Sequence, residues 1–228
     1  MNLVIFDIDG TVVNSVAADD ECFIQTFRDL HQIDLLGSNW SDFEHVTDSG
    51  LTNEIFQSRL NRFPADEEVK NIQNYFFDLL SLRQSEFKEI RGASDFIVKL
   101  GEREDFFVAF ATGGWGRTAW LKLQCLGLPM KNYIIRSADD HFKRTEITKL
   151  AIEASKEKVG NKKFESITYF GDGQWDLEAS KELNINFIGV DSDGNEKLND
   201  LGAEIVIRDY QKADEKLVIK PASCRSEG

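Results

Sequence analysis

The stretch that decides the fold is Leu-Val-Ile-Phe-Asp-Ile-Asp-Gly-Thr at residues 3–11, where an apolar strand runs into two aspartates and a glycine turn. Asp7 and Asp9 are two positions apart, so an extended chain would direct both carboxylates to one face, although the turn at Gly10 can re-aim the second. Neighbouring carboxylates repel each other, and a hard divalent cation is the simplest compensating charge. The alternative interpretation is an acidic turn that merely closes a buried strand.

The charge of the chain restricts its partners. The 228 residues carry a formal net charge of −13, from 40 acidic and 27 basic side chains. This charge argues against nucleic acid and anionic membrane partners, which require clustered lysine and arginine. A phosphate-binding site would have to be made positive locally, by a metal ion, backbone N–H groups and one or two basic side chains.

The cysteines and the apolar runs indicate a compartment. Cys22, Cys125 and Cys224 are far apart and lack the spacing of a zinc or redox site, so we expect free thiols. No apolar run reaches the roughly 18 residues of a membrane span, and no leader pattern precedes the first strand. We therefore expect a cytoplasmic, soluble protein, either a monomer or a homodimer.

The chain changes character twice along its length. Residues 15–90 have helical periodicity, as in the i, i+4, i+7 spacing of Phe23, Phe27 and Leu30, and almost no strand signal. From residue 106 onward, expected strands alternate with expected helices. The strands are expected at residues 106–111, 133–136, 167–170, 187–190 and 205–207, and the helices at 93–100, 115–126, 144–158, 176–183 and 195–201.

This alternation predicts an α/β fold with a doubly wound parallel sheet of Rossmann-like type. The first strand belongs with the later ones, so the core would comprise residues 1–14 and 91–228. Residues 15–90 would form a smaller, all-helical domain inserted after the first strand. This insertion would lie above the carboxyl ends of the strands, where open α/β sheets bind ligands.

Two further strand ends carry candidate site residues. Residues 107–111 lead into Thr112, Gly113 and Gly114, whose hydroxyl and backbone N–H groups could bind a phosphate, although such turns often only connect elements. Residues 167–170 lead into Asp172, where a metal ligand would be needed, and then Asp176. Asp176 could cap a helix, accept a hydrogen bond from a basic residue or touch the metal shell.

A pair of cations, Lys143 and Arg144, opens an expected helix. A pair of basic residues is ordinarily solvated at the surface. Because the helix dipole disfavours positive charge at that end, a functional role for one of the two cations is the better explanation here.

In this order, these pieces resemble the haloacid dehalogenase (HAD) superfamily of aspartate-nucleophile hydrolases. The four motifs of that family correspond to Asp7-Ile8-Asp9-Gly10-Thr11, Thr112-Gly113, Lys143 or Arg144, and Gly171-Asp172 with Asp176. A helical insertion directly after the first motif is typical of phosphoglycolate phosphatase-like members, which carry it as a cap. The resemblance therefore implies a catalytic core of residues 1–14 and 91–228 and a helical cap domain of residues 15–90, with hinges near residues 13–16 and 89–92. Many members have Lys-Pro at the third motif, whereas this chain has Lys143-Arg144-Thr145, so either cation could face the site, with a slight preference for Lys143.

The resemblance implies a magnesium-dependent phosphatase that acts on a small phosphorylated metabolite. Asp7 would attack phosphorus to form an aspartyl-phosphate, and Asp9 would act first as general acid and then as general base. A halide leaving group needs no proton, so Asp9 favours phosphoester chemistry over dehalogenation.

The same resemblance implies how the substrate and the ion would be held. Thr112, Gly113, Gly114 and Lys143 or Arg144 would bind phosphoryl oxygens. The side chains of Asp7 and Asp172, the Asp9 carbonyl and, in the metal shell, Asp176 would hold Mg²⁺.

Two alternatives to this function stay open. One is a phosphomutase of the β-phosphoglucomutase kind, and the other is a non-catalytic phosphate-binding module. A nucleotide-binding P-loop fits poorly, because residues 113–117 lack its spacing and its Lys-Ser/Thr pair.

Overall fold

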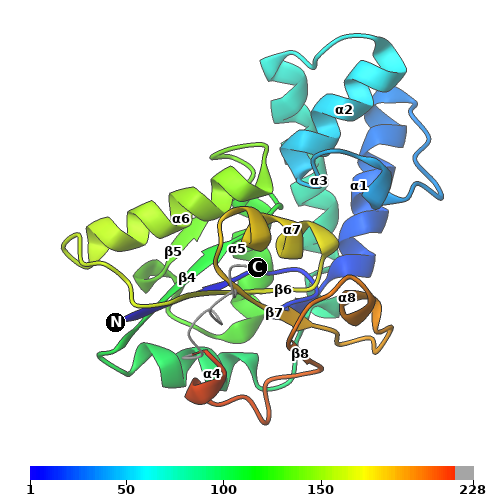
Figure 1. The fold of residues 1–228 in the computed structure, drawn as a ribbon. Helices are drawn as coiled ribbons and strands as arrows, with labels where there is room; N and C mark the ends of the chain where they lie inside the picture. The colour runs from blue at the N-terminus through cyan, green and yellow to red at the C-terminus, as the bar shows by residue number, and fades with distance from the viewer. Residues whose placement is uncertain (219–228) are drawn as a thin grey trace.

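The computed structural model describes residues 1–218, and its centre is a six-stranded sheet in the order β5-β4-β1-β6-β7-β8 (Figure 1). All neighbouring strands are parallel. The strands are β1 (Asn2–Phe6), β4 (Phe106–Ala111), β5 (Ile134–Arg136), β6 (Ile167–Gly171), β7 (Asn186–Val190) and β8 (Val206–Ile207). The predicted doubly wound parallel sheet is therefore confirmed. Cys224 and the last part of the expected core, residues 219–228, lie outside the described residues.

Alternate residues of β1 pack on opposite faces of the sheet, as expected for a central parallel strand. Val4 and Phe6 belong to an apolar cluster that includes Phe96, whereas Leu3 and Ile5 belong to a cluster that includes Ile147. Helices of the core therefore cover both faces. They are α4 (Ala93–Gly101), α5 (Gly116–Leu123), α6 (Arg144–Lys158), α7 (Gln174–Glu182) and α8 (Lys197–Asp200).

An aromatic cluster holds the carboxyl end of β1. The Phe6 ring is fully buried and stacks on Phe170 of β6, with 4.8 Å between ring centroids. Phe96 and Tyr210 pack against Phe6 from the same side, and the Tyr210 hydroxyl donates a hydrogen bond of 3.0 Å to the Thr11 carbonyl. Since Asp7 follows Phe6 directly, this cluster fixes the backbone that presents Asp7.

The segment between β1 and β4 is mainly helical and rises above one end of the sheet (Figure 1). It contains α1 (Val16–His31), α2 (Asp48–Leu60) and α3 (Asp66–Leu82). We call residues 15–90 the cap; its limits as a domain stay a prediction.

Two short strands join the cap to the core. β2 (Val13–Asn14) pairs antiparallel with β3 (Lys88–Glu89), which brings the two connections side by side near the expected hinges. The expectation of a purely helical segment was wrong for β3, because two residues are too few to give a strand signal in a sequence.

Other local predictions had mixed outcomes. The bounds expected for β4 and α6 match the structure, but the helix expected at 115–126 ends at Leu123 and continues as a 3-10 turn. Phe23 and Phe27 are buried, whereas Leu30 is 37% exposed, so the apolar face of α1 is shorter than expected. Cys22 and Cys125 are free thiols.

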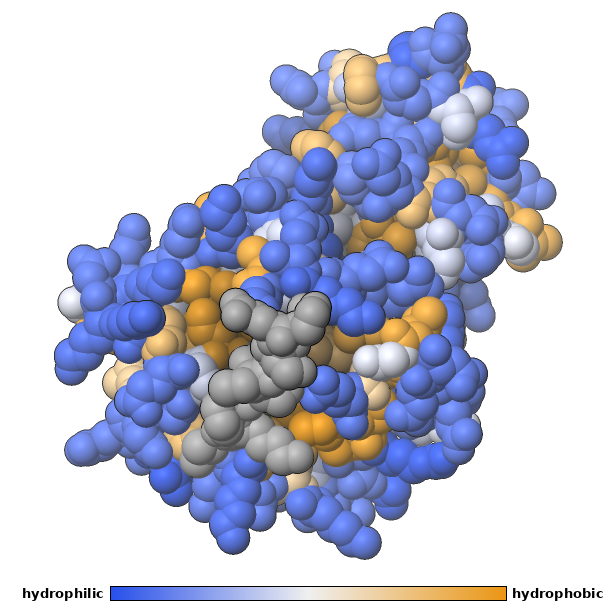
Figure 2. Space-filling view, viewed as in Figure 1, coloured by the Kyte–Doolittle hydropathy of each residue, from blue (hydrophilic) through white to orange (hydrophobic). Residues whose placement is uncertain are grey.

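The exterior agrees with the acidic composition. The face drawn in Figure 2 is mostly hydrophilic, and apolar residues emerge mainly in the recesses between surface side chains. None of the helices within residues 1–218 has the length and apolar character that crossing a bilayer requires.

Candidate active site

Three turns meet at the carboxyl edge of the sheet because their strands are neighbours in the order β4-β1-β6. Asp7 follows β1, Thr112 follows β4 and Asp172 follows β6. All three line a cavity of about 140 Å³, and residues of the cap complete its wall. The sequence analysis predicted that these strand ends converge, and the structure brings them together.

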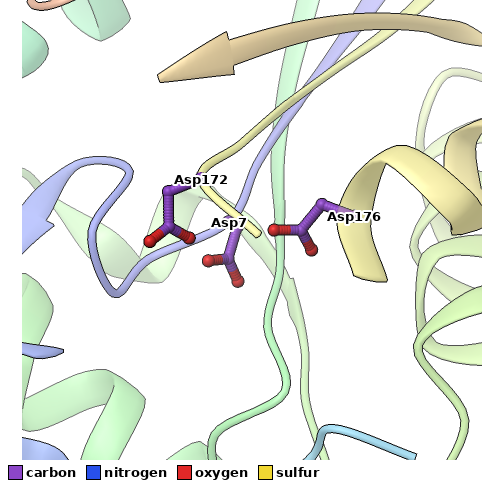
Figure 3. A group of neighbouring side chains, drawn as sticks. All are labelled: Asp7, Asp172 and Asp176. Atoms are coloured by element: carbon purple, nitrogen blue, oxygen red, sulfur yellow. The ribbon is translucent and has the colours of Figure 1, made fainter. Parts of the chain in front are cut away.

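Three carboxylates, those of Asp7, Asp172 and Asp176, lie close together (Figure 3), and Asp7 and Asp172 line the cavity. One ligand oxygen each from Asp7, Asp172 and Asp176 lies within 4.8 Å of the others. Burial raises the pKa of Asp7 to about 7, opposed by Arg144 and reinforced by the nearby Asp176. Burial and the adjacent Asp7 also raise the pKa of Asp172 well above its usual range. A mostly buried set of oxygen donors, whose negative charge Arg144 compensates only in part, fits a hard divalent cation.

Asp176 is engaged on both of its carboxylate oxygens. The Gly173 N–H donates to Oδ2 at 3.0 Å at the start of α7, and the Tyr169 hydroxyl donates to Oδ1 at 3.2 Å. The Arg144 Nε lies 3.4 Å from Oδ1. Of the three expected roles, the helix cap is present. The expected hydrogen bond from a basic residue is replaced by an ion pair, because Arg144 Nε has no hydrogen-bond partner among the described residues. Contact with a metal ion stays a prediction.

Arg144 is the cation that reaches the site. Its Nη1 lies 2.8 Å from Asp7 Oδ1, and its side chain is only 10% exposed. Lys143 is exposed, and its Nζ lies 5.9 Å from the centroid of the Phe142 ring. The preference for Lys143 does not fit this geometry, because Lys143 is the extended N-cap residue, whereas Arg144 begins α6. Gly113 permits the approach, since a Cβ there would lie 2.5 Å from Arg144 Nη2.

The turn after β4 offers fewer free N–H groups than expected. Thr112 is buried, and its Oγ1 accepts a hydrogen bond of 3.1 Å from the Gly114 N–H. The Trp115 N–H donates to Asp48 Oδ2 of the cap at 2.7 Å. Gly114, expected to bind phosphate, thus uses its N–H within the turn. The Thr112 hydroxyl proton and the Gly113 N–H are what this turn can offer to an anion.

Asp9 has a cation of its own, which the sequence analysis missed. Lys122 Nζ lies 2.8 Å from both Asp9 Oδ1 and Asp9 Oδ2, and the Ser15 hydroxyl also donates to Oδ1. The turn therefore re-aims the second carboxylate away from Arg144. No local sequence signal marks this role, because Lys122 resembles a surface residue by type and is buried only by the packing of α5.

The cap also contributes residues that the sequence analysis did not single out as site residues. Asp19, Asp20 and Asp48 line the cavity together with apolar side chains such as Phe23 and Trp40. Burial raises the pKa of Asp20 to about 6 and that of Asp48 to about 7. No local sequence signal distinguishes these carboxylates from the other acidic side chains of the cap.

Comparison with known proteins agrees with this architecture. The model of the haloacid dehalogenase-like hydrolase family matches residues 4–190. Among curated proteins, no sequence match is found.

Solved structures share the fold at low sequence identity. A hydrolase from Pseudomonas syringae is 22% identical, with a TM-score of 0.72 over 92% of this chain and 94% of that chain. A HAD hydrolase of family IA, variant 3, from Entamoeba histolytica is 17% identical, with a TM-score of 0.69 over 96% and 98%. A mutant of CbbY from Rhodobacter sphaeroides, in complex with xylulose-1,5-bisphosphate, is 18% identical, with a TM-score of 0.67 over 92% and 95%.

Gly10 provides a test of the acidic cluster. Its φ is +69°, and a Cβ there would lie 2.0 Å from Asp172 Oδ2, whereas Gly37 has a φ of +77° and open space around it. Both Gly10→Ala and Gly37→Ala should lose about 1–2 kcal/mol of stability from left-handed backbone strain. Only Gly10→Ala should also displace Asp172 and weaken Mg²⁺ binding in titration calorimetry. Equal Mg²⁺ affinity in the two variants would contradict this assignment of Asp172.

Proposed function

The chain belongs to the haloacid dehalogenase-like hydrolase family, and on this premise we propose that it is a magnesium-dependent phosphatase acting on a small phosphorylated metabolite. The observation that carries the proposal is the position of Asp7, buried on the cavity wall between Arg144 and the two other carboxylates of the acidic cluster. A carboxylate that lines a cavity and is paired with a guanidinium is suited to attack an electrophilic phosphorus.

The attack would join an Asp7 oxygen to phosphorus as the ester oxygen departs. Arg144 orients the Asp7 carboxylate through its bond to Oδ1. The Thr112 hydroxyl, the Gly113 N–H and the Arg144 guanidinium would stabilise the phosphoryl oxygens as charge spreads over them. Mg²⁺ would offset the negative charges of the nucleophile and the phosphate. The residues that would hold it are Asp7, Asp172, the Asp9 carbonyl and, in the metal shell, Asp176.

Asp9 is proposed as the group that moves protons. Its side chain lines the same cavity, and Ser15 and Lys122 fix its orientation. Protonated from solvent before the cap closes, it would give that proton to the departing alkoxide and then, as the carboxylate, take one from the water that hydrolyses the aspartyl-phosphate. Because a halide would need no such proton, this arrangement supports phosphoester hydrolysis.

We propose that the cap acts as a lid, because it contacts the turns of the core beside the cavity. At the start of α2, the Asp48 N–H donates to the Gly113 carbonyl at 2.7 Å, and the Ser49 hydroxyl donates to the Ala138 carbonyl at 2.8 Å. A closed lid excludes bulk water and leaves little room for a macromolecular substrate. The small cavity of about 140 Å³ supports a metabolite of a few carbon atoms.

A panel of small phosphomonoesters, assayed with and without Mg²⁺, tests the proposal. We expect Mg²⁺-dependent release of inorganic phosphate. Formation of an isomer without free phosphate would indicate a phosphomutase instead. No turnover of any substrate would favour a binding module and overturn the proposal.

Substitutions of Arg144 and of its neighbour Lys143 test which of the two cations binds the phosphate. Arg144→Met should lower kcat/KM by about 10²- to 10³-fold, as removal of an oxyanion donor does in other enzymes. Lys143→Met should leave kcat/KM within about twofold of wild type, because its side chain is exposed. Steady-state kinetics on one good substrate measures both. A larger loss in Lys143→Met than in Arg144→Met would show that the cation is misassigned.

The charge of the cavity predicts a preference among substrates. Among the described residues that line it, Arg144 is the one cationic side chain, whereas the cap contributes Asp19, Asp20 and Asp48. At pH 8, above the pKa values of Asp20 and Asp48, a second anionic group on the substrate should be repelled. We expect kcat/KM for phosphoglycolate to be at least tenfold below that for 2-hydroxyethyl phosphate, about 1.4 kcal/mol. A preference for phosphoglycolate would contradict this reading of the cavity.

A further inference from the structure

Lys122 of α5 is fully buried, which is unusual for a lysine. Its ammonium makes ion pairs with Asp9 and Asp19. Burial alone would lower the pKa of Lys122, but Asp19 and Asp9 outweigh burial and raise it above its usual range. The side chain is therefore a buried cation that depends on these carboxylates for compensation.

The partners of Lys122 come from two parts of the chain. Asp9 lies in the turn after β1, and Asp19 lies in the first turn of α1, at the beginning of the cap. Ser15, the N-cap residue of α1, donates to the same Asp9 carboxylate that Lys122 holds. Asp9 is thus tied to the core through Lys122 and to the beginning of the cap through Ser15.

Lys122 does not reach the reacting atoms itself. It has no exposed surface and does not line the cavity, whereas Asp9 does. Asp9 Oδ2 faces the turn after β4, at 3.7 Å from the place where a Cβ of Gly114 would lie. The nucleophile, Asp7, is paired separately with Arg144. Loss of Lys122 should therefore disturb the steps that use Asp9 and spare those that need only Asp7.

We propose that Lys122 is a positioning residue, which bridges Asp9 to Asp19 and thereby holds the Asp9 carboxylate toward the leaving group when α1 of the cap is docked. This inference rests on the proposed function, with Asp9 as the group that protonates the departing oxygen. The bridge links the placement of a proton donor to the position of the cap, so substrate would be cleaved efficiently only in the closed cavity.

The basicity of the leaving group separates this role from a general structural one. An alkoxide must be protonated as it departs, whereas 4-nitrophenolate is a weak base and departs without a proton. The test compares the two kinds of substrate in the first phosphoryl transfer, measured by rapid quench for an alkyl phosphate and by the 4-nitrophenol burst for 4-nitrophenyl phosphate. Both assays use wild-type protein and Lys122→Met at saturating Mg²⁺.

Lys122→Met should slow transfer from the alkyl phosphate by about 10²-fold or more, as loss of a general acid does, and should change the 4-nitrophenol burst rate by less than about threefold. In an Asp9→Asn background, the same substitution should cause no further loss with the alkyl phosphate, because both changes remove one function. Lys122→Arg, which keeps the charge, should recover part of the alkyl phosphate rate.

Equal losses on both substrates, or losses that add in the double variant, would overturn the role of Lys122. Asp19→Asn replaces Lys122→Met if that variant does not fold, and it should show the same selective loss with the alkyl phosphate; an equal loss on both substrates would again overturn the inference. The alkyl phosphate is one that the wild-type protein hydrolyses in the panel above, so absence of turnover across that panel would instead refute the proposed function.

Discussion

Buried negative charge where β1 and β6 end is the constraint on which the rest of the site depends. Asp7, Asp172 and Asp176 converge there, and Arg144 is the cation that contacts two of them, Asp7 and Asp176. Carboxylates in such a place are costly unless cations or hydrogen bonds compensate them. The neighbouring backbone is shaped by the same need, since Gly10 gives room to Asp172 and Gly113 gives room to Arg144.

A second ion cluster borders the cavity through Asp9 and Asp19, and it separates the two aspartates of the first motif. Asp7 belongs to the cluster of Arg144, and Asp9 belongs to the cluster of Lys122 and Asp19. Because each carboxylate has its own cation, the two can be given different tasks although only one residue lies between them. β2 and the start of α1 lie between Asp9 and Asp19 in the sequence, and β3 pairs with β2. Because Ser15 also donates to Asp9, the position of the cap and that of Asp9 are joined physically.

The sequence allowed the sheet and the acidic residues to be predicted because both follow from short-range patterns. Apolar strands that end in Asp7, Thr112 and Asp172 must bring these residues to one edge if the strands are parallel neighbours. Other features depend on packing that no local pattern encodes. The choice between Lys143 and Arg144 depends on whether α6 begins at one or the other, and Lys122 resembles a surface residue by type although the fold buries it. Asp48 lines the cavity only because α2 packs against the turn after β4.

The central claim is that Asp7 forms a covalent bond to phosphorus, and trapping that bond tests it most directly. Asp9→Asn protein is mixed with 4-nitrophenyl [³²P]phosphate and Mg²⁺, because this substrate needs no acid for the first step, whereas hydrolysis of the intermediate needs the missing base. Acid quenching and peptide mapping then locate the label. The account predicts a hydroxylamine-sensitive phosphoryl group on Asp7. Label on another residue, or continued phosphate release without labelled protein, would contradict it.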